Sequence, residues 1–417
     1  MSSNDKSAPL NLIYLCHEFP KITETFVYRE IKELLDLGHR IRVYSIKKPP
    51  DVSRIEGAEN LISITKYTPA DLGGKFILAQ FKWLFRKPIT YISELLRVLF
   101  KDSPDTNIKS TARLGMFLRG ALLASMINEE RDCESIQVPG TGHELIAAHV
   151  VHVLTGKKYG FTLHAPLALY VGSPLLGIHA RDASWIASIS KDAREKLIEI
   201  AGENIREKVK IVHCGIEIEK FKPVERKKNG KIIGVGSLIE RKGHADLIEV
   251  VEILAKKGLN VHLEIVGEGP QKNILESLIS RLNLEDRVKL SGGRHPEYVR
   301  ESLEDSEVFA LACRIDANGA RDGIPVAIME AMAMGLPCVS TRVAGIPELM
   351  ENEISGMLVE RDNPRQLAAA IEKLITDRSL SEKIAEASRK KIEDEFTLSG
   401  QIRKLVELIE SKTSTKL

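Results

Sequence analysis

Residues 231–267 read KIIGVGSLIERKGHADLIEVVEILAKKGLNVHLEIVG, and this stretch decides the fold class. The β-branched run at 232–235 predicts a strand that leads into a glycine-containing loop. Apolar residues at helical spacing follow, and a second run with strand character stands at 262–266. A strand, a helix and another strand in such close succession predict a parallel pair in an α/β sheet.

The same alternation continues through nearly the whole chain. In the first half, a helix is expected over 25–37, and strands are expected at 11–15, 40–46, 135–138, 159–163, 185–189 and 208–212. In the second half, further strands are expected at 288–290, 308–312, 337–341 and 356–359. This rhythm predicts two Rossmann-like, doubly wound domains facing a central cleft, with the site at the carboxyl ends of the strands.

Chain length supports the same division, because 417 residues exceed what one small core usually organises. We predict an N-terminal Rossmann-like domain over residues 8–215 and a C-terminal Rossmann-like domain over residues 216–395. Residues 396–417 are expected to form a helix that packs back on the surface and a short tail.

Composition excludes several classes of protein. The 60 basic and 58 acidic residues nearly cancel, which gives no reason to expect a nucleic-acid partner. Five scattered cysteines without a CxxC pair predict reduced thiols and no zinc site. Because the first residues are polar and no apolar run is long enough to span a bilayer, we expect a cytoplasmic protein.

One stretch departs from the strand and helix rhythm. Residues 75–101, KFILAQFKWLFRKPITYISELLRVLFK, contain six basic residues, one acidic residue and six aromatic residues. Pro88 divides the stretch into two short helices. Their apolar faces are expected either to lie in the core of the first domain or to form a basic amphipathic surface. Such a surface would rest on anionic lipid or hold a lipid-linked substrate.

The loop Gly236–Gly243 has the composition of a diphosphate cradle. Glycines let backbone N–H groups approach an oxyanion, and Lys242 supplies a positive charge. The spacing is not that of a dinucleotide fold, because Ile239 stands where the third glycine or an alanine is needed. Hydride transfer is therefore disfavoured.

A second feature with anion-binding chemistry begins at Asp322. Pro325 is expected to be the first residue of a helix, since it lacks the N–H that would lose its partner there. Asp322, Gly323 and Ile324 would then form the preceding loop at the positive end of the helix dipole. Glu330 lies roughly 7–8 Å further along the helix axis, about the span from a diphosphate to a ribose. The alternative is a capping Asp and a solvated Glu.

Together these residues resemble the retaining GT-B glycosyltransferases of the large group 1 (family 4) type. Asp322 and Glu330 match the E-x7-E motif, with Asp in place of the first Glu. His17-Glu18-Phe19-Pro20 and Thr23-Glu24-Thr25-Phe26 resemble the start of the branch that builds exopolysaccharides, including colanic-acid-type transferases. The other matching segments are Val212-His213-Cys214-Gly215-Ile216, Val266-Gly267-Glu268-Gly269-Pro270, Gly335-Leu336-Pro337 and Val343-Ala344-Gly345-Ile346-Pro347-Glu348.

The resemblance implies a hexosyltransferase that moves a sugar from a UDP- or GDP-linked donor to a glycan or lipid-linked glycan, with retention of configuration. Residues 8–215 would bind the acceptor, residues 216–395 would bind the nucleotide sugar, and neither a metal nor another cofactor would be bound. The implied catalytic residues are His164, Asp322 and Lys242. The implied donor-binding residues are Gly236, Ser237, Arg241, Lys242, Gly267, Gly323, Ile324, Pro325 and Glu330.

Three features depart from the family pattern, one of them around His164, where Pro166 and Leu167 replace the polar residues common in this branch. Ser237 stands where the family usually has a phosphate-binding Arg, and Arg241 or Arg321 could substitute for it. Asp322 is one methylene shorter than Glu, so its contact with the donor sugar could run through water. From the residues alone, His164 is also compatible with a core or capping role.

Other functions remain open on the sequence. A sugar-nucleotide epimerase of similar fold would turn over the donor without an acceptor. A relative that binds nucleotide but has lost activity would fit the missing Arg at Ser237, and an oxidoreductase is a distant further alternative. A transferase acting on lipid-linked glycans would be cytoplasmic, at the inner face of the membrane, with residues 75–101 as a peripheral contact.

Overall fold

The computed structural model describes residues 9–21, 24–50, 58–69, 73–100, 110–133, 135–170, 172–223, 225 and 227–413. Thr23, Lys101 and the residues before 9 and after 413 therefore lie outside the described residues. The chain forms two compact units. Among the described residues, unit 1 holds those up to Ile189, 193–212 and 402–413, and unit 2 holds 190–192 and those within 213–401.

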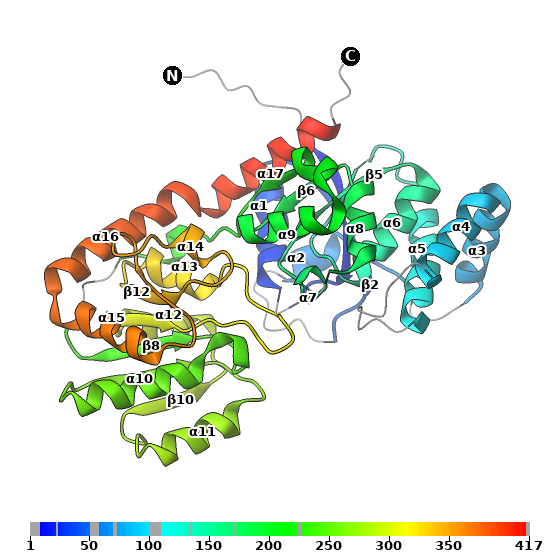
Figure 1. Cartoon of the computed structure of the whole chain (residues 1–417). Helices are drawn as coiled ribbons and strands as arrows, with labels where there is room; N and C mark the ends of the chain where they lie inside the picture. The colour runs from blue at the N-terminus through cyan, green and yellow to red at the C-terminus, as the bar shows by residue number, and fades with distance from the viewer. Residues whose placement is uncertain are drawn as a thin grey trace, which may run out of the picture. The chain divides into compact units, whose positions relative to one another are not determined.

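Unit 1 is built on a seven-stranded parallel sheet in the order β3-β2-β1-β4-β5-β6-β7 (Figure 1). The register is regular, with Leu12 opposite Ile41 on one side of β1 and Ser135 on the other. The strands are β1 Asn11–Glu18, β2 Arg40–Lys47, β3 Thr65–Tyr67, β4 Ser135–Val138, β5 Lys158–Leu163, β6 Trp185–Ser188 and β7 Val209–Ile211.

Local sequence explains where the helices of unit 1 begin and end. Gly38, at φ +89°, follows the end of the first helix in the left-handed conformation that terminates helices. Ser173 accepts a hydrogen bond from the Leu176 N–H at 3.4 Å and so caps the start of α8. The helices are α1 Thr25–Asp36, α2 Ala58–Ser63, α3 Gly74–Arg86, α4 Pro88–Phe100, α5 Ser110–Ile127, α6 His143–Thr155, α7 Leu167–Tyr170, α8 Pro174–Asp182, α9 Lys191–Ala201 and α17 Leu398–Thr413.

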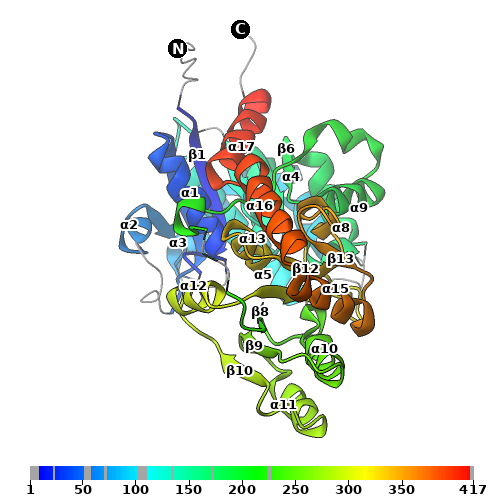
Figure 2. The ribbon, with the colours of Figure 1, turned by 90° about the vertical axis from the view of Figure 1, so that its left-hand side faces the viewer.

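Unit 2 contains a six-stranded parallel sheet in the order β10-β9-β8-β11-β12-β13, whose first three strands are side by side in Figure 2. The strands are β8 Lys231–Val235, β9 His262–Val266, β10 Val288–Gly292, β11 Val308–Leu311, β12 Cys338–Thr341 and β13 Met357–Val359. The helices are α10 His244–Lys256, α11 Lys272–Arg281, α12 Pro296–Glu304, α13 Val326–Ala333, α14 Ile346–Leu349, α15 Pro364–Thr376 and α16 Arg378–Glu395.

Apolar helix faces fill the core of unit 2 against the sheet. Leu247, Val251 and Leu254 of α10 lie in one buried cluster, while Ile328 and Met332 of α13 lie in another. Burial of this kind supplies most of the stabilisation of such a fold, about 25 cal/mol for each Å² of apolar surface removed from water.

The predicted fold class is confirmed: both units are α/β with parallel, Rossmann-like sheets. The predicted division of residues 75–101 at Pro88 is also confirmed, because α3 ends at Arg86 and α4 begins at Pro88. No helix within the described ranges is both long enough and apolar enough to cross a bilayer.

Candidate active site

The loop after β8 is held in a conformation that only glycines allow. A Cβ on Gly243, at φ +64°, would lie 1.8 Å from the carbonyl oxygen of Ala312, and backbone atoms cannot yield by that much. The short 3-10 turn Glu240–Lys242 is therefore pressed against the chain that leaves β11. This contact brings Arg241 and Lys242 to the carboxyl end of the sheet.

Four charged side chains meet at this edge. Lys242 Nζ lies 2.7 Å from Asp322 Oδ2, and Arg241 Nε lies 3.1 Å from Asp322 Oδ1. Arg241 Nη1 also lies 3.4 Å from Asp316 Oδ2. The side chains of Lys242 and Asp322 are only 16% and 18% exposed, so water screens this cluster weakly. The structure thus joins Asp322 to two other predicted site residues, Arg241 and Lys242, which lie about 80 positions earlier in the chain.

A buried histidine that was not predicted as a site residue fixes the same loop. His244 Nε2 lies 3.2 Å from the carbonyl oxygens of both Gly236 and Ser237. Both partners only accept, so Nε2 carries the hydrogen and donates. Burial lowers the pKa of His244 to about 4, and the ring is neutral at physiological pH. The only available sequence signal was its place, directly after Lys242-Gly243 at the start of α10.

The loop after β9 supports the loop after β8 from behind. The Gly236 N–H donates to the Val266 carbonyl at 3.0 Å, and the Leu238 N–H donates to the Glu268 carbonyl at 2.8 Å. A Cβ on Gly267 would lie 1.9 Å from the Gly236 carbonyl oxygen, which leaves no room for any other residue. Gly267 therefore shapes the cradle through close backbone packing.

The helix that carries Glu330 begins one residue later than predicted. Pro325 is the N-cap, with ψ 122°, and α13 starts at Val326. The Pro325 carbonyl accepts a hydrogen bond from the Ile328 N–H at 3.1 Å. Pro325 therefore caps the helix, and it is not the first helical residue. Glu330 is the fifth residue of α13 and is half-buried.

The loop before α13 contributes backbone groups to the candidate site more than it contributes side chains. Ile324 is only 6% exposed and packs in the core, while the Gly323 carbonyl accepts from the Gly345 N–H at 3.1 Å. The first N–H groups of a helix have no partner within the helix and point toward its amino end. The first backbone N–H groups of α13 and the positive end of its dipole can therefore bind an anion beside Asp322.

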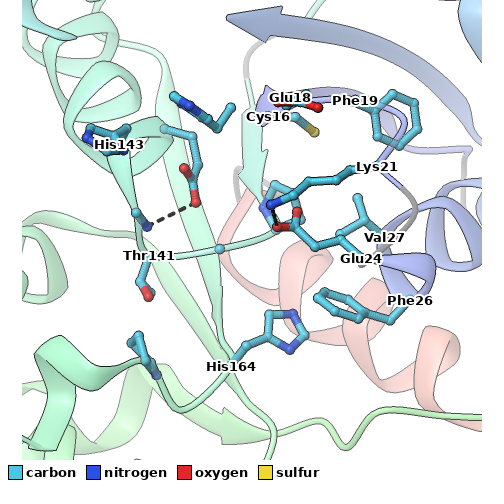
Figure 3. A pocket seen from close by; sticks show the side chains of 16 residues that line it. Cys16, Glu18, Phe19, Lys21, Glu24, Phe26, Val27, Thr141, His143 and His164 are labelled. Atoms are coloured by element: carbon cyan, nitrogen blue, oxygen red, sulfur yellow. Dashed lines mark hydrogen bonds and ion pairs between the residues drawn. The ribbon is translucent and has the colours of Figure 1, made fainter. Parts of the chain in front are cut away.

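Unit 1 has a pocket of about 340 Å³ at the carboxyl ends of β1, β4 and β5, shown in Figure 3. Two imidazoles form one wall, since the rings of His17 and His143 stack with centroids 5.0 Å apart. Burial, helped by the charge of Lys47, lowers the pKa of both histidines, that of His17 to about 4. The two rings are therefore neutral hydrogen-bonding groups.

His164, the predicted catalytic histidine, lines this pocket. Its ring is 4.2 Å from the ring of Phe26, and burial lowers its pKa to about 4. Ala165, next in the chain, has a φ of +50°, a conformation that costs a non-glycine residue energy and is enriched at functional sites. His164 belongs to unit 1, whereas Lys242 and Asp322 belong to unit 2.

Acidic and basic groups complete the lining. Lys21 Nζ and Glu24 Oε1 form an ion pair at 2.5 Å (Figure 3). The Gly142 N–H donates to Glu144 Oε1 at 3.0 Å. Burial raises the pKa of Glu144. That Lys21, His143 and Glu144 line this pocket was not predicted, because one polar residue after a strand is a common pattern. Among the described residues, no three His, Cys, Asp or Glu side chains gather as metal ligands.

Comparison with known proteins finds sequence similarity to glycosyltransferases, most specifically in the second unit. Residues 215–391 match the sequence profile of the family described as glycosyl transferases group 1. An amylovoran biosynthesis glycosyltransferase of Erwinia amylovora is 28% identical over 96% of this chain and 99% of its own length. A putative colanic acid biosynthesis glycosyltransferase of Escherichia coli is 28% identical over 94% of this chain and 98% of its own.

Solved structures agree on the fold. A glycosyltransferase from Rickettsia africae has a TM-score of 0.72 at 16% identity, over 98% of this chain and 100% of that one. The Anabaena protein HepE, solved in complex with UDP, has a TM-score of 0.71 at 18% identity, over 96% of this chain and 100% of that one. The chain therefore has the GT-B fold of glycosyltransferases, and its residues 215–391 match the group 1 glycosyl transferases.

Proposed function

We propose that this enzyme transfers a hexose from a nucleoside diphosphate sugar to a hydroxyl group of a glycan, with retention of configuration, during exopolysaccharide synthesis. Relatives named for amylovoran and colanic acid biosynthesis align with 96% and 94% of the chain and support the polymer class. Similar folds solved with UDP and with UDP-glucose support a nucleotide-sugar donor. UDP- and GDP-linked sugars are the two donor classes to be tested.

The cluster of Lys242, Arg241 and Asp322 carries this proposal. It lies at the carboxyl end of β8 and brings two cations together in a weakly screened place. In the proposed reaction, the bond between the anomeric carbon and the diphosphate oxygen breaks, and negative charge develops on the leaving group. Fixed cations and amides that face such a charge usually make the largest contribution to catalysis.

In this proposal Asp322 both orients the cations and accepts hydrogen bonds from the donor sugar, while Glu330 accepts from the ribose. Gly236 and Gly267, whose N–H groups donate to the Val266 and Gly292 carbonyls, shape the loop by close packing, and the loop at Gly323 supplies backbone. Because Arg241 already lies beside Lys242 and Asp322, it supplies the positive charge that Ser237 lacks. A second charged side chain in the cradle argues for a working donor site.

The pocket of unit 1 is proposed to hold the acceptor. His17 Nδ1 is buried and has no hydrogen-bond partner among the described residues, so it is available to an acceptor hydroxyl. His164, neutral and packed on Phe26, would position the sugar or the acceptor without donating a proton. The acceptor oxygen bonds to the anomeric carbon on the face that the diphosphate leaves, and the hydroxyl proton goes with the diphosphate.

The acceptor is proposed to be a lipid-linked glycan, handled at the inner face of the membrane. Growing polysaccharide chains of the relatives' class must be held where the next transferase finds them, and a lipid anchor does this by confining them to a surface. Comparing turnover of a lipid-linked and a water-soluble glycan acceptor tests this part independently.

The test of the donor site is a thermal-shift panel of UDP, GDP, ADP and NAD, each with Mg²⁺ and with EDTA. A ligand at one hundred times its Kd stabilises the folded state by about 2.7 kcal/mol, a shift of roughly 5–10 °C for a domain of this size. We expect one nucleoside diphosphate to give this shift, undiminished by EDTA. Acceptor-dependent release of that diphosphate from its sugar donor then identifies transfer. No response to any nucleotide would refute the proposal.

A further inference from the structure

Helices α3 and α4 expose an unusual amount of apolar surface. Thirteen large apolar side chains are exposed in the described part of the chain, and eight of them lie on these two helices. The most exposed are Phe85 at 80% and Ile89 at 84%. Side chains this apolar usually meet a partner, because leaving each in water forgoes its transfer free energy.

The exposed residues form one stripe on each helix. At about 100° per residue, the α3 residues Ile77, Leu78, Phe81 and Phe85 fall within an arc of about 100°. The α4 residues Ile89, Ile92, Leu96 and Phe100 fall within about 80° in the same way. These are the spacings of two amphipathic helices with a second apolar face.

The other face of each helix is already used by the core of unit 1. Trp83 of α3 is 1% exposed and donates through Nε1 to the Ala121 carbonyl of α5 at 3.0 Å. Tyr91 of α4 packs edge-on against Phe117 of α5, with ring centroids 5.0 Å apart. The core interpretation of residues 75–101 is thus right for these buried side chains, but it leaves the exposed stripes unexplained. Figure 1 shows both helices outside α5.

Positive charge flanks the stripe of α3. Lys75, Lys82 and Arg86 are exposed, lie together along one border of the stripe, and form no ion pair with any described acidic residue. A pocket of about 530 Å³ adjoins this border, and Lys75, Leu78 and Lys82 line it together with Lys66. Its acids are Glu129 and Glu130, of which Glu130 is compensated by Lys66 at 2.6 Å.

We propose that these stripes and the flanking lysines form a docking surface for an anionic phospholipid bilayer, with α3 and α4 lying in the plane of the interface. Each helix has 13 residues, about 20 Å, which is too short to cross a hydrocarbon core of about 30 Å. Apolar side chains enter the boundary between headgroups and acyl chains, and the lysines meet lipid phosphates. The pocket beside Lys75 and Lys82 receives one such headgroup.

A second copy of this chain is a poorer occupant of the same surface. It would cover the apolar stripes, but it would also bring two sets of unpaired lysines and arginines toward each other. An anionic membrane covers the stripes and neutralises the charge at once. The docking surface does not depend on the transfer reaction, so the two proposals can fail separately.

Co-sedimentation with lipid vesicles, without donor or acceptor, tests the surface. We expect the wild-type chain to pellet with vesicles of phosphatidylcholine and phosphatidylglycerol in equal parts, and weakly with phosphatidylcholine alone. The double variant Lys75→Glu, Lys82→Glu should lose at least tenfold in binding to the anionic vesicles, since each basic residue contributes about fivefold at such a surface. The matched control is Arg403→Glu, Lys404→Glu, an equal charge change at exposed residues of α17, and it should bind like the wild type.

A second variant pair isolates the apolar contribution. Phe81→Ser with Phe85→Ser should reduce binding to both vesicle types by at least tenfold, whereas the exposed Ile274→Ser with Ile354→Ser in unit 2 should not. Wild-type protein that stays in the supernatant with anionic vesicles would overturn the proposal. So would a stable dimer that the Phe81 and Phe85 changes convert to a monomer without affecting sedimentation. Turnover of a water-soluble acceptor should be the same in all variants.

Discussion

A buried histidine in unit 1 should make the stability of that unit depend on pH. His149 of α6 is fully buried, with Nδ1 2.8 Å from Glu94 Oε1 of α4 and Nε2 2.9 Å from Asp182 Oδ2 of α8. Arg97 adds contacts of 3.4 Å to Glu94 and 3.3 Å to Asp182. Each ring nitrogen lies within hydrogen-bond distance of a carboxylate oxygen, and Arg97 Nη1 lies 3.4 Å from Nε2. The two carboxylates and Arg97 are balanced in charge when His149 is protonated.

The pKa directions agree with this geometry. Burial alone would lower the pKa of His149, but hydrogen bonds and charges from Asp182 and Glu94 outweigh it and raise the pKa. The His149 hydrogen bond holds the pKa of Asp182 at about 2, with Arg97 contributing. The neighbouring groups are His179 at 4.9 Å, His152 and the edge of Tyr159. Burial keeps the pKa of His179 low, so it does not compete for the proton.

The perturbation is Asp182→Asn, which keeps the shape of the side chain and removes its charge. A pKa of about 2 instead of 3.8 corresponds to roughly 2.4 kcal/mol. Because the Asp182 side chain is 41% exposed, solvent screening reduces this to about 1 kcal/mol. The expected fall in melting temperature near pH 6 is about 2–4 °C.

The sign of the pH dependence follows from both groups. A raised pKa of His149 stabilises the fold below about pH 6.5, and this contribution is lost as the pH rises through the folded-state value. A lowered pKa of Asp182 stabilises the fold above about pH 4, and this contribution is lost as the pH falls toward 2. The difference between wild type and Asp182→Asn should therefore be largest between about pH 4 and pH 6.5.

The assay is thermal unfolding of both proteins at pH 5, 7 and 9, with Asp132→Asn as the control. Asp132 forms a comparable Arg pair, 2.7 Å from Arg42, but it is 54% exposed and has no histidine partner. Its replacement should have a small effect that is equal at all three pH values. An Asp182→Asn difference that is the same at pH 5 and pH 9 would refute the charge-balanced cluster.

The donor and acceptor sites give further predictions. Glu330→Ala should weaken nucleoside diphosphate binding by about tenfold to a hundredfold, the effect of losing a charged hydrogen bond, in a titration by calorimetry; unchanged affinity would count against its ribose contact. His164→Ala should lower kcat and leave the donor Kd unchanged. A loss confined to donor binding would contradict the proposed role of His164 in positioning the reactants. Gly243→Ala, whose Cβ would lie 1.8 Å from the Ala312 carbonyl, should lower both donor affinity and the melting temperature of unit 2, and wild-type values for both would refute the cradle geometry.

Most of the fold was predictable because buried parallel strands are short, β-branched and separated by amphipathic helices. The predicted strands at 135–138 and 262–266 have the same bounds in the structure. Strand β3 was missed because Thr65–Tyr67 has only three residues, none fully buried, and pairs with β2 alone. The one-residue difference at Pro325 has a similar local origin, since a proline φ of −65° suits a helix and an extended residue equally.

The residues of the candidate site were predictable only one loop at a time. Lys242 and Asp322 could each be singled out from the residues around them, but their ion pair depends on which strands are neighbours, and that is not readable from local pattern. Asp316 and His244 were missed for the same reason. An acid in a loop and a histidine at a helix start become informative only when the structure places them against Arg241 and the Gly236 carbonyl.

Sheet topology explains why the two candidate sites lie where they do. In unit 2 the chain runs from β8 outward to β10, then returns to β11 on the other side of β8, so the winding reverses between β8 and β11. Helices leave the sheet in opposite directions at such a point, and the loops diverge to leave room for a ligand. The contact between Gly243 and Ala312 and the ion pair between Lys242 and Asp322 both span this point.

The same reversal occurs in unit 1 between β1 and β4, and residues 16–19 and 139–144 line the pocket on its two sides. A glycosyltransferase needs one binding site for the charged diphosphate leaving group of the donor and another for the neutral hydroxyl group of the acceptor. In our proposal, Lys242 and Arg241 suit the candidate site of unit 2 to the charged leaving group, and the neutral rings of His17 and His143 suit the pocket of unit 1 to the hydroxyl. The same kind of reversal thus occurs at both candidate sites, and in our proposal the residues placed at each reversal decide which partner of the reaction it holds.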